Sequence, residues 1–564
     1  MKKYIIIFTA VLSLCTLTGC EKFLTRDAKN QTTDDQWWMT KSQLNTVVNE
    51  CYMAMNSGTV ITSTTYMNIP WNSGSQQNYT YAEFLNKIEN EGLSDNGITC
   101  ANYIDNSAIT SGTVSSKHGN ITNFWQGRYA AIRLCSRFLE HYGQAVFDPD
   151  KQPHEGIQTI DRWAAEVRAM RAYYHLDLFM NFGEIPIVDH VISQGEQFLE
   201  RKTRTECVEW IAAELEEASK NLPKEPQTSD ERWRWTKGAC YAYLSYLYLF
   251  ESDWENARKW AQAVIDLGKY DIYVSPENKA ASYTEQFLYA AYTNNTKESI
   301  LTRNMGCMGT TGRLLSPGYK NGGTGVCPTA ALVDAYELAD GRTIDELSAE
   351  DQARLRIYPK SMARDPRLEM TILFPNEQFL GYTNDVWTYD PSNLDYIGKR
   401  NSTKSGYWVK KWCNETDLAS PLAGKLPFQL MRYSVVLLNY VEAQIELGNL
   451  DDPLIYTYLN KIRSRAGQPD VNVTKYATQE KLRELVRRER RVELAFEGHR
   501  IFDIRRWKIG EQVMNGNVYG AKLPDKDELY LAETRSFNPA RDYVWPIPAT
   551  EMTANTSMVQ NYGY

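Results

Sequence analysis

The feature that most constrains the fold is a helical periodicity that recurs along the chain. From Ile157 to Phe182, apolar residues return every three or four positions, as in an amphipathic helix with one buried face. Gly183 supplies a left-handed C-terminal residue, and Pro186 prevents the helix from continuing. Helices are predicted near residues 40–56, 123–142, 157–182, 204–220, 235–251, 254–267, 428–448, 452–466 and 478–498. The chain is therefore predicted to be mainly α-helical.

Some of these helices form pairs joined by short turns. The segment 235–251 is followed, after Ser252 and Asp253, by the segment 254–267, and Met431–Leu447 is followed by Leu454–Ile462. Pairs of about 34 residues with alternating small and large side chains are typical of tetratricopeptide repeats. Such repeats bury their apolar faces only by stacking on neighbours. The predicted scaffold is therefore a tetratricopeptide-like helical repeat over about 123–267 and 428–507.

Two long regions interrupt the helical pattern. Residues 59–122 are rich in Ser, Thr, Asn and Gly, and residues 270–427 combine a Gly-rich stretch at 306–325 with extended strings such as 300–304. Both regions also carry many aromatic residues. Insertions of this length on a helical scaffold usually carry function rather than stability. We expect irregular, β-containing insertions that hold a ligand site.

The N-terminus has the organisation of an export signal. Lys2 and Lys3 precede an apolar run over residues 4–14, and the segment ends at Leu17-Thr-Gly-Cys20. The run is too short to span a bilayer, which takes roughly 20 residues, and fits a secretory signal peptide. Its end resembles the lipobox of bacterial lipoproteins, in which the cysteine thiol receives a lipid. We expect a signal peptide over 1–19 and a single domain over 20–564, anchored to a membrane through lipidated Cys20.

Charge and motif content argue against several classes of function. The formal net charge is −8, and a nucleic-acid partner would require a basic face. The chain has no HExxH, GxSxG, GxxxxGK[ST] or strand-associated GxGxxG motif, and its six histidines lack metal-ligand spacing. No catalytic, metal or cofactor site is therefore predicted. A glycosidase with two acids stays open as an alternative, because its carboxylates can come from distant positions.

The cysteines are scattered along the chain without a CxxC pair. A zinc site or a small fold held by disulfides would have tighter spacing. We expect most of them to be buried as small hydrophobic residues. Cys307 and Cys327 flank the Gly-rich stretch and form the pair to test first for a disulfide.

Three motifs together carry a more specific resemblance. They are Arg168-Ala-Met-Arg-Ala-Tyr-Tyr-His-Leu-Asp-Leu-Phe-Met-Asn-Phe-Gly-Glu-Ile-Pro186, the Arg-rich segment 487–507 and Tyr543-Val-Trp-Pro-Ile-Pro-Ala-Thr-Glu551. With the lipobox and the segment 432–443, they resemble the SusD/RagB family of outer-membrane nutrient-binding lipoproteins along the whole chain. Acids and arginines in 483–507 lie at helical spacing, so we interpret them as ion pairs of the scaffold. Arg168 and Arg171 are interpreted in the same way.

The resemblance implies a SusD-like fold and a function without catalysis. A member of this family would sit lipid-anchored on the outer membrane, facing the cell exterior. It would capture an oligosaccharide or polysaccharide and deliver it to a SusC-like TonB-dependent transporter. Two alternatives stay open, namely a peptide-capturing member of the same family and a transporter-associated scaffold that binds no ligand of its own.

Candidate ligand residues follow from the chemistry of sugars. A pyranose packs its C–H face on an aromatic ring, while its hydroxyl groups reach polar side chains at the rim. The resemblance places the site on the insertions, at about 59–122 and 285–410. The candidates are Trp71, Tyr79, Asp95, Asn96, Tyr289, Tyr292, Arg313, Tyr319, Trp387 and Tyr389. Among these, Asp95 and Asn96 are predicted hydrogen-bonding partners on a turn.

Overall fold

The predicted helical segments all form helices. The computed structural model describes residues 37–56, 87, 90–100, 106–228, 231–302, 315, 317, 323–379, 381–383, 386–387, 390–400, 402–413 and 426–564. The long helices are α4 (Lys41–Asn56), α7 (Gly119–His141), α8 (Thr159–Phe182), α9 (Arg204–Lys220), α10 (Lys237–Phe250), α11 (Trp254–Asp266), α19 (Tyr433–Glu446), α20 (Leu454–Arg465) and α21 (Gln479–Glu493). The mainly α-helical prediction is confirmed.

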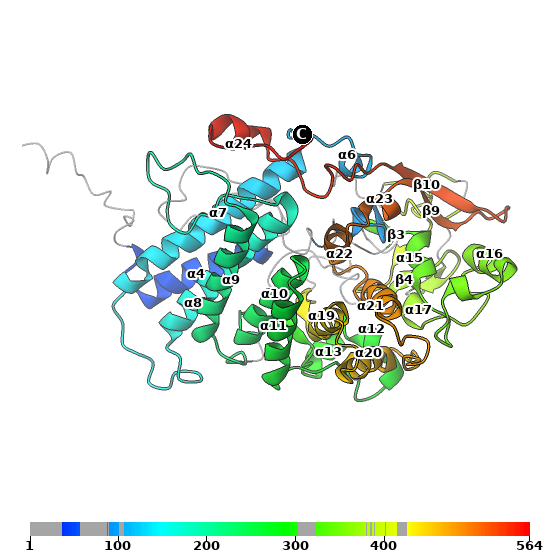
Figure 1. The fold of residues 1–564 in the computed structure, drawn as a ribbon, viewed down its shortest axis with the longest axis horizontal. Coiled ribbons are helices and arrows are strands. Elements are labelled where there is room, and N and C mark those ends of the chain that lie inside the picture. Colours follow the sequence, from blue (N-terminus) through cyan, green and yellow to red (C-terminus); the bar gives the residue numbers. More distant parts are fainter. Residues whose placement is uncertain are drawn as a thin grey trace, which may run out of the picture.

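Each long helix packs against the next in an extended stack (Figure 1). Contacts run from α4 through α7, α8, α9, α10 and α11 to α19, which also contacts α20 and α21. The two predicted pairs are α10 with α11 and α19 with α20. In the first, the Thr236 side chain accepts a hydrogen bond from the backbone of Ala239, and Asp253 caps α11 in the same way through Asn256. These caps satisfy backbone donors that a helix start leaves unpaired.

Two predicted helices are shorter than the periodicity suggests. The segment predicted as 428–448 begins as strand β8 (Gln429–Arg432), which pairs antiparallel with β2 (Ser299–Thr302). The segment predicted as 478–498 ends at Glu493, because Phe496 and Gly498 adopt φ values of 61° and 80°. Left-handed residues cannot continue a right-handed helix. The chain turns there and resumes as α22 (Arg500–Trp507).

The remaining elements are short. The helices are α6 (Ser107–Thr110), α12 (Ser282–Glu285), α13 (Tyr289–Thr293), α15 (Ala330–Ala335), α16 (Ala349–Ile357), α17 (Arg367–Thr371), α23 (Gly510–Val513) and α24 (Ala549–Ala554). The strands are β1 (Gly97–Thr99), β3 (Val326–Pro328), β4 (Ile372–Leu373), β5 (Gln378–Phe379), β6 (Tyr382–Thr383), β7 (Trp408–Val409), β9 (Gly516–Lys522) and β10 (Leu529–Arg535). Within the described residues, they form antiparallel pairs β1–β3, β4–β7, β5–β6 and β9–β10.

A buried ion-pair network joins these short elements to the helix stack. Its centre is the Glu493 carboxylate, which pairs with Arg367 at 3.0 Å, with Arg432 at 2.8 Å and with Arg465. Burial opposes the ionisation of Glu493, but the guanidinium groups of Arg465, Arg432 and Arg367 hold its pKa well below the ordinary value. The three arginines come from α17, β8 and α20, so one carboxylate on α21 connects four elements.

The motif arginines act within the scaffold, as predicted. Arg168 and Arg171 on α8 both pair with Glu214 on α9, each at 2.6 Å. Glu489 on α21 pairs with Arg367 and with Arg463 of α20, the latter at 3.0 Å. Each charge therefore has a buried or half-buried partner on a neighbouring element, which is what burial of an ion requires.

The network predicts a large stability loss on removal of its central charge. In Glu493→Gln, three arginines lose a shared partner while they stay buried. We expect the free energy of unfolding to fall by about 3 kcal/mol or more, measured by urea denaturation at pH 7. The matched control is Glu484→Gln on the same helix, whose pair with Lys481 is half exposed. That change should lower the free energy by less than about 1 kcal/mol, and equal effects would contradict the assignment.

The difference in the free energy of unfolding between wild type and Glu493→Gln should also depend on pH. The pKa of Glu493 is depressed in the folded protein, so its contribution is complete above its unfolded value, near 4.5. As pH falls below that value, Glu493 becomes protonated in the unfolded chain but stays ionised in the folded chain. The contribution of Glu493 to the free energy of unfolding therefore decreases. The difference in stability between wild type and Glu493→Gln should therefore narrow from pH 5 towards pH 3. A difference that stays constant over this range would contradict the depressed pKa.

Candidate functional site

The predicted ligand residues divide into two groups. Trp71, Tyr79, Arg313, Tyr319 and Tyr389 lie outside the described residues, as does Cys20. The structure places the other five, and it does not bring them all together. Tyr289 and Tyr292 belong to α13. Trp387 lies near α16 and the β9–β10 hairpin, and these elements are well apart from α13 in Figure 1.

Asp95 and Asn96 lie on a turn, as predicted, but both side chains are buried and already paired. The Asp95 carboxylate accepts hydrogen bonds from Arg500 at 2.7 and 2.9 Å and pairs with Arg491 at 2.9 Å. Burial raises its pKa, but the two arginines outweigh that effect and lower it to about 2. Asn96 donates to Glu91 at 3.2 Å and accepts from Arg491 at 2.8 Å. Both residues hold the turn against α21 and α22, and their side-chain oxygens are occupied by these arginines.

Tyr289 and Tyr292 are both half-buried on α13. The backbone carbonyl of Tyr292 accepts a hydrogen bond from Arg232 at 3.3 Å. Burial raises the pKa of the Tyr292 hydroxyl well above its ordinary value, so this group stays protonated. Neither residue lines the pocket that contains Trp387.

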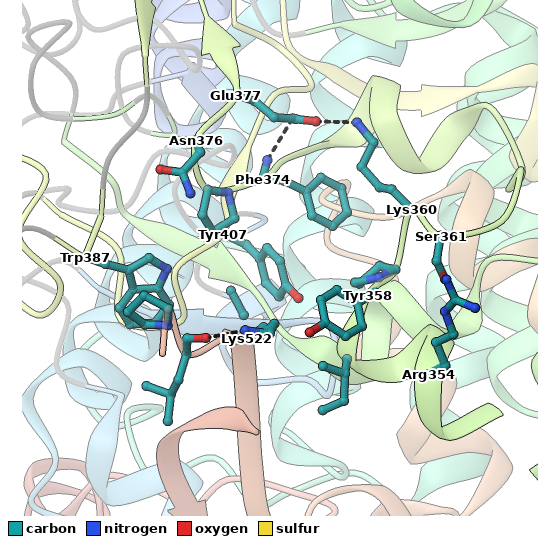
Figure 2. Close-up of a pocket in the computed structure, with 16 residues that line it drawn as sticks. Arg354, Tyr358, Lys360, Ser361, Phe374, Asn376, Glu377, Trp387, Tyr407 and Lys522 are labelled. Atoms are coloured by element: carbon teal, nitrogen blue, oxygen red, sulfur yellow. Dashed lines mark hydrogen bonds and ion pairs between the residues drawn. The ribbon is translucent and has the colours of Figure 1, made fainter. Parts of the chain in front are cut away.

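Trp387 lines a pocket of about 580 Å³ (Figure 2). Helix α16 and strand β9, which contribute to its lining, lie at the far end of the molecule from α4 (Figure 1). Three parts of the chain form the walls of the pocket: residues 354–361 at the end of α16, residues 374–377 after β4, and residues 521–524 at the end of β9. Tyr407, directly before β7, completes the lining. The pocket has the size and the mixed apolar and polar lining of small-molecule binding sites.

The aromatic residues of the pocket differ in exposure. Tyr407 and Phe374 are 1% and 6% exposed and form the inner wall, whereas Tyr358 is 43% exposed and Trp387 is half-buried. In Figure 2, Trp387 and Tyr358 lie on opposite sides of Tyr407. Two partly exposed rings that face one pocket are suited to packing against the C–H face of a ring-shaped ligand.

Trp387 is held in place by close packing. Its ring meets Tyr530 of β10 edge to face, with 5.7 Å between ring centroids. Gly406 has a φ of 84°, and a Cβ atom there would lie 2.9 Å from Ala521 and 3.2 Å from the Trp387 ring. A residue without a side chain is therefore required beside the tryptophan. Tyr407, which follows Gly406, is held by a hydrogen bond that the Thr403 hydroxyl donates to its carbonyl at 2.6 Å.

The polar groups of the pocket include one fixed ion pair. The Glu377 carboxylate accepts a hydrogen bond from the Phe374 backbone at 3.0 Å and pairs with Lys360 (Figure 2). Burial opposes the charge of Lys360, but Glu377 and Glu369 raise its pKa, so it stays a cation. Lys522 lies 5.4 Å from the ring centre of Tyr358. These groups place hydrogen-bond donors and acceptors beside the aromatic walls.

Sequence reasoning missed part of this lining. Tyr358 and Lys522 carried no motif, and the β9–β10 hairpin that supplies Lys522 was not predicted. A signal for the hairpin is present, because the turn-forming run 524–528 separates two short stretches that contain strand-forming residues, Val518-Tyr519 and Leu529-Tyr-Leu531. Trp408 and Trp412, which lie in the same aromatic stretch as Tyr407, are fully buried core residues.

Neither a metal site nor a membrane span is found in the described part of the chain. No group of three or more His, Cys, Asp or Glu side chains there is arranged to hold a metal ion. None of the helices described combines the length and hydrophobicity that crossing a bilayer requires.

Comparison with known proteins identifies the relatives of this chain. A family model described as the SusD family matches residues 283–564, which is half of the chain, and a model described as starch-binding and associating with the outer membrane matches residues 40–249. The chain is 24% identical to the SusD-like protein P2 of Formosa agariphila, over 100% of this chain and 99% of the relative.

Solved structures agree with this relationship. A SusD-like protein from Bacteroides fragilis superposes with a TM-score of 0.75 at 25% identity, over 94% of this chain and 99% of that one. A SusD-like carbohydrate-binding protein from the same species gives a TM-score of 0.76 at 25% identity, over 92% and 99%. The family match over half of the sequence, together with a shared fold over nearly all of it, means that this chain belongs to the SusD family.

Proposed function

We propose that this protein is a cell-surface glycan-binding lipoprotein. It captures an oligosaccharide or polysaccharide and delivers it to a SusC-like TonB-dependent transporter of the outer membrane. The observation that carries the proposal is the pocket in which half-buried Trp387 and exposed Tyr358 flank Tyr407 beside the Lys360–Glu377 pair. The family descriptions and the carbohydrate-binding relative support the same ligand class.

The pocket chemistry suits sugar binding without catalysis. Aromatic walls favour the C–H faces of pyranose rings, and the charged groups at the rim can exchange hydrogen bonds with hydroxyl groups. Trp71, Tyr79, Arg313, Tyr319 and Tyr389 remain proposed ligand residues from the two insertions, with Tyr289 and Tyr292 as further candidates. We propose no covalent step, and the protein binds and transfers its ligand unchanged.

The lipid anchor and the transporter explain how capture leads to uptake. Lipidated Cys20 would hold the domain on the outer membrane with the pocket facing the cell exterior. Two acyl chains or more give a stable anchor, because each buried methylene contributes about 0.8 kcal/mol. Bound glycan would then stay close to the transporter, which raises its effective concentration there.

The two rings that flank the pocket should each contribute to glycan binding. Trp387→Ala and Tyr358→Ala should each weaken glycan binding several-fold, and the double variant by about tenfold or more, because stacking surface is lost. Binding is measured by isothermal titration calorimetry on residues 21–564, against a panel of starch-, xylan-, galactan- and pectin-derived oligosaccharides and a set of peptides. Tyr562→Ala is the matched control, since Tyr562 is 83% exposed and does not line the pocket. It should bind within about twofold of wild type.

The other outcomes of this titration separate the alternatives. If only Trp71→Ala plus Tyr319→Ala abolishes glycan binding, the ligand sits on the insertions and the pocket assignment is wrong. Binding of peptides with silence on every glycan would make the protein a peptide-capturing member, and basic peptides would then suit the acidic chain. Silence on both ligand classes would leave a transporter-associated scaffold.

Lipidation and membrane attachment should both depend on Cys20. Cys20→Ala should abolish incorporation of labelled fatty acid and move the protein from the membrane fraction to the soluble fraction. Protease added to intact cells should degrade the wild-type protein, and a tagged wild-type protein should co-purify with a TonB-dependent transporter. Cys15→Ala, within the same signal segment, is the control and should leave lipid incorporation unchanged. Lipid labelling that persists in Cys20→Ala would refute the assigned anchor.

A further inference from the structure

Two cysteines far apart in sequence meet at the β1–β3 strand pair. Cys327 lies in β3 opposite Ile98 of β1, and Cys100 follows β1 directly. The Cys100 backbone donates to the Gly325 carbonyl at 2.8 Å, which extends the antiparallel ladder by one residue. Side chains two residues apart on a strand point to the same face, so Cys100 lies on the face of Ile98. Cys327 is directly opposite Ile98, and the two cysteines therefore share one face of the strand pair. Their sulfur atoms are 3.0 Å apart, although 227 positions separate the residues along the chain.

The surroundings of the two thiols keep them in this arrangement. Cys100 is 3% exposed and Cys327 is fully buried, and both pack with Ile98 under Val518 of β9 and Ala532 of β10. Below the strands, the Lys404 ammonium group donates to the Thr99 carbonyl at 2.8 Å. Arg535 donates to the carbonyls of Ser94 and Gly97 at 2.6 and 2.7 Å. To form a disulfide, the two sulfur atoms have to close from 3.0 Å to a bond length of about 2.05 Å.

The surroundings of Cys327 also favour its thiolate form. Burial opposes the ionisation of Cys327, but hydrogen bonds from Cys100, from the Ser405 hydroxyl and from the Lys404 backbone lower its pKa to about 6. The thiolate is the nucleophile in thiol–disulfide exchange. By contrast, burial raises the pKa of Cys240, which has no cysteine partner in the described residues, to a value that keeps it a thiol.

We propose that Cys100 and Cys327 form a disulfide bond in the exported protein. While the exported chain folds, before β9 and β10 cover the strand pair, the Cys327 thiolate attacks a sulfur of a disulfide-bearing oxidant, such as a thiol–disulfide oxidoreductase, and one thiolate of the oxidant leaves. The Cys100 thiol loses its proton and attacks the Cys327 sulfur of the mixed disulfide, which releases the second thiolate. The two cysteines lose two electrons and two protons, and the oxidant is reduced to a dithiol. The proposal rests on the export proposed above, because the cytosol keeps thiols reduced.

The bond would secure the base of the candidate pocket. Thr403 and Ser405, which contact Cys327, belong to the loop that presents Tyr407. Gly520 of β9 packs directly on the Ser405 backbone, and Ala521 and Lys522 follow it in the pocket wall. A crosslink at Cys327 therefore fixes the strand pair on which both the loop and the hairpin rest. The disulfide does not depend on which ligand the pocket takes.

The test is a disulfide map of the full-length lipidated protein isolated from membranes. The protein is denatured at acidic pH, alkylated without reduction and digested, and its peptides are analysed by mass spectrometry. We expect one crosslinked peptide pair that contains Cys100 and Cys327, with Cys240 fully alkylated. Alkylated Cys100 and Cys327 in lipidated protein, or a bond from either to another cysteine, would overturn the proposal. Absence of the lipid on Cys20 would instead refute the export premise.

A second arm is independent of export. The reduced, purified chain from residue 21 is unfolded in urea and refolded in the presence of oxidised glutathione, so that both thiols are accessible before they are buried, and the same crosslinked peptide should form. Reduction of the oxidised protein should lower its Tm by on the order of 5 °C, because the bond closes a long loop. Cys100→Ala/Cys327→Ala should be insensitive to reductant, whereas Cys240→Ala, a buried cysteine without a cysteine partner in the described residues, should keep the wild-type response. Failure of the crosslink to form with glutathione would overturn the proposal whatever the location of the protein.

Discussion

The Glu493 carboxylate is the constraint on which the rest of the structure depends. Three arginines from separate elements share it, and Arg432 continues the network to Glu298 and Glu497, each pair fully or almost fully buried. Ions so placed are tolerated only when every partner is present. The candidate pocket depends on the same network, because Arg367 precedes the residues 374–377 of one wall, and Lys411, paired with Glu497 at 2.7 Å, follows Tyr407 closely.

The helical scaffold could be predicted from the sequence because its information is local. The prediction of a helix over 157–182 differs from α8 by two residues at its start, since the apolar stripe, Gly183 and Pro186 all lie within one segment. The strand β8 could not be separated from the helix that follows it. All four of its residues, Gln429-Leu-Met-Arg432, are buried, and this short stretch leads into the apolar residues of α19 without a Gly or Pro to mark a boundary. Its partner β2 lies far away in the sequence, so no local signal specifies the pairing.

The candidate site could be predicted only where the residue type by itself suggests contact with a ligand. Trp387 was among the predicted ligand residues because aromatic side chains in the insertions suit packing against a sugar, whereas Tyr358 and Lys522 reach the pocket from distant segments. Asp95 and Asn96, predicted as hydrogen-bonding partners on a turn, are buried and paired with arginines. Polar residues on a turn suggest exposure to solvent. In the folded chain, however, Asn96 is buried and accepts a hydrogen bond from an arginine that is 395 positions away in the sequence. Long-range partners of this kind are invisible to periodicity and spacing.

The pairing of β2 with β8 has a consequence for how such proteins diversify. Because these strands are antiparallel neighbours, the chain leaves and rejoins the helix stack at one place, and the segment between them forms a cassette. Cassettes with adjacent ends tolerate changes of length and content, since loop closure depends only weakly on length. Arg367 and Lys411 lie inside this cassette and pair with Glu493 and Glu497. Evolution, or an engineer grafting a new specificity, is free to rewrite the cassette only if both cations are retained.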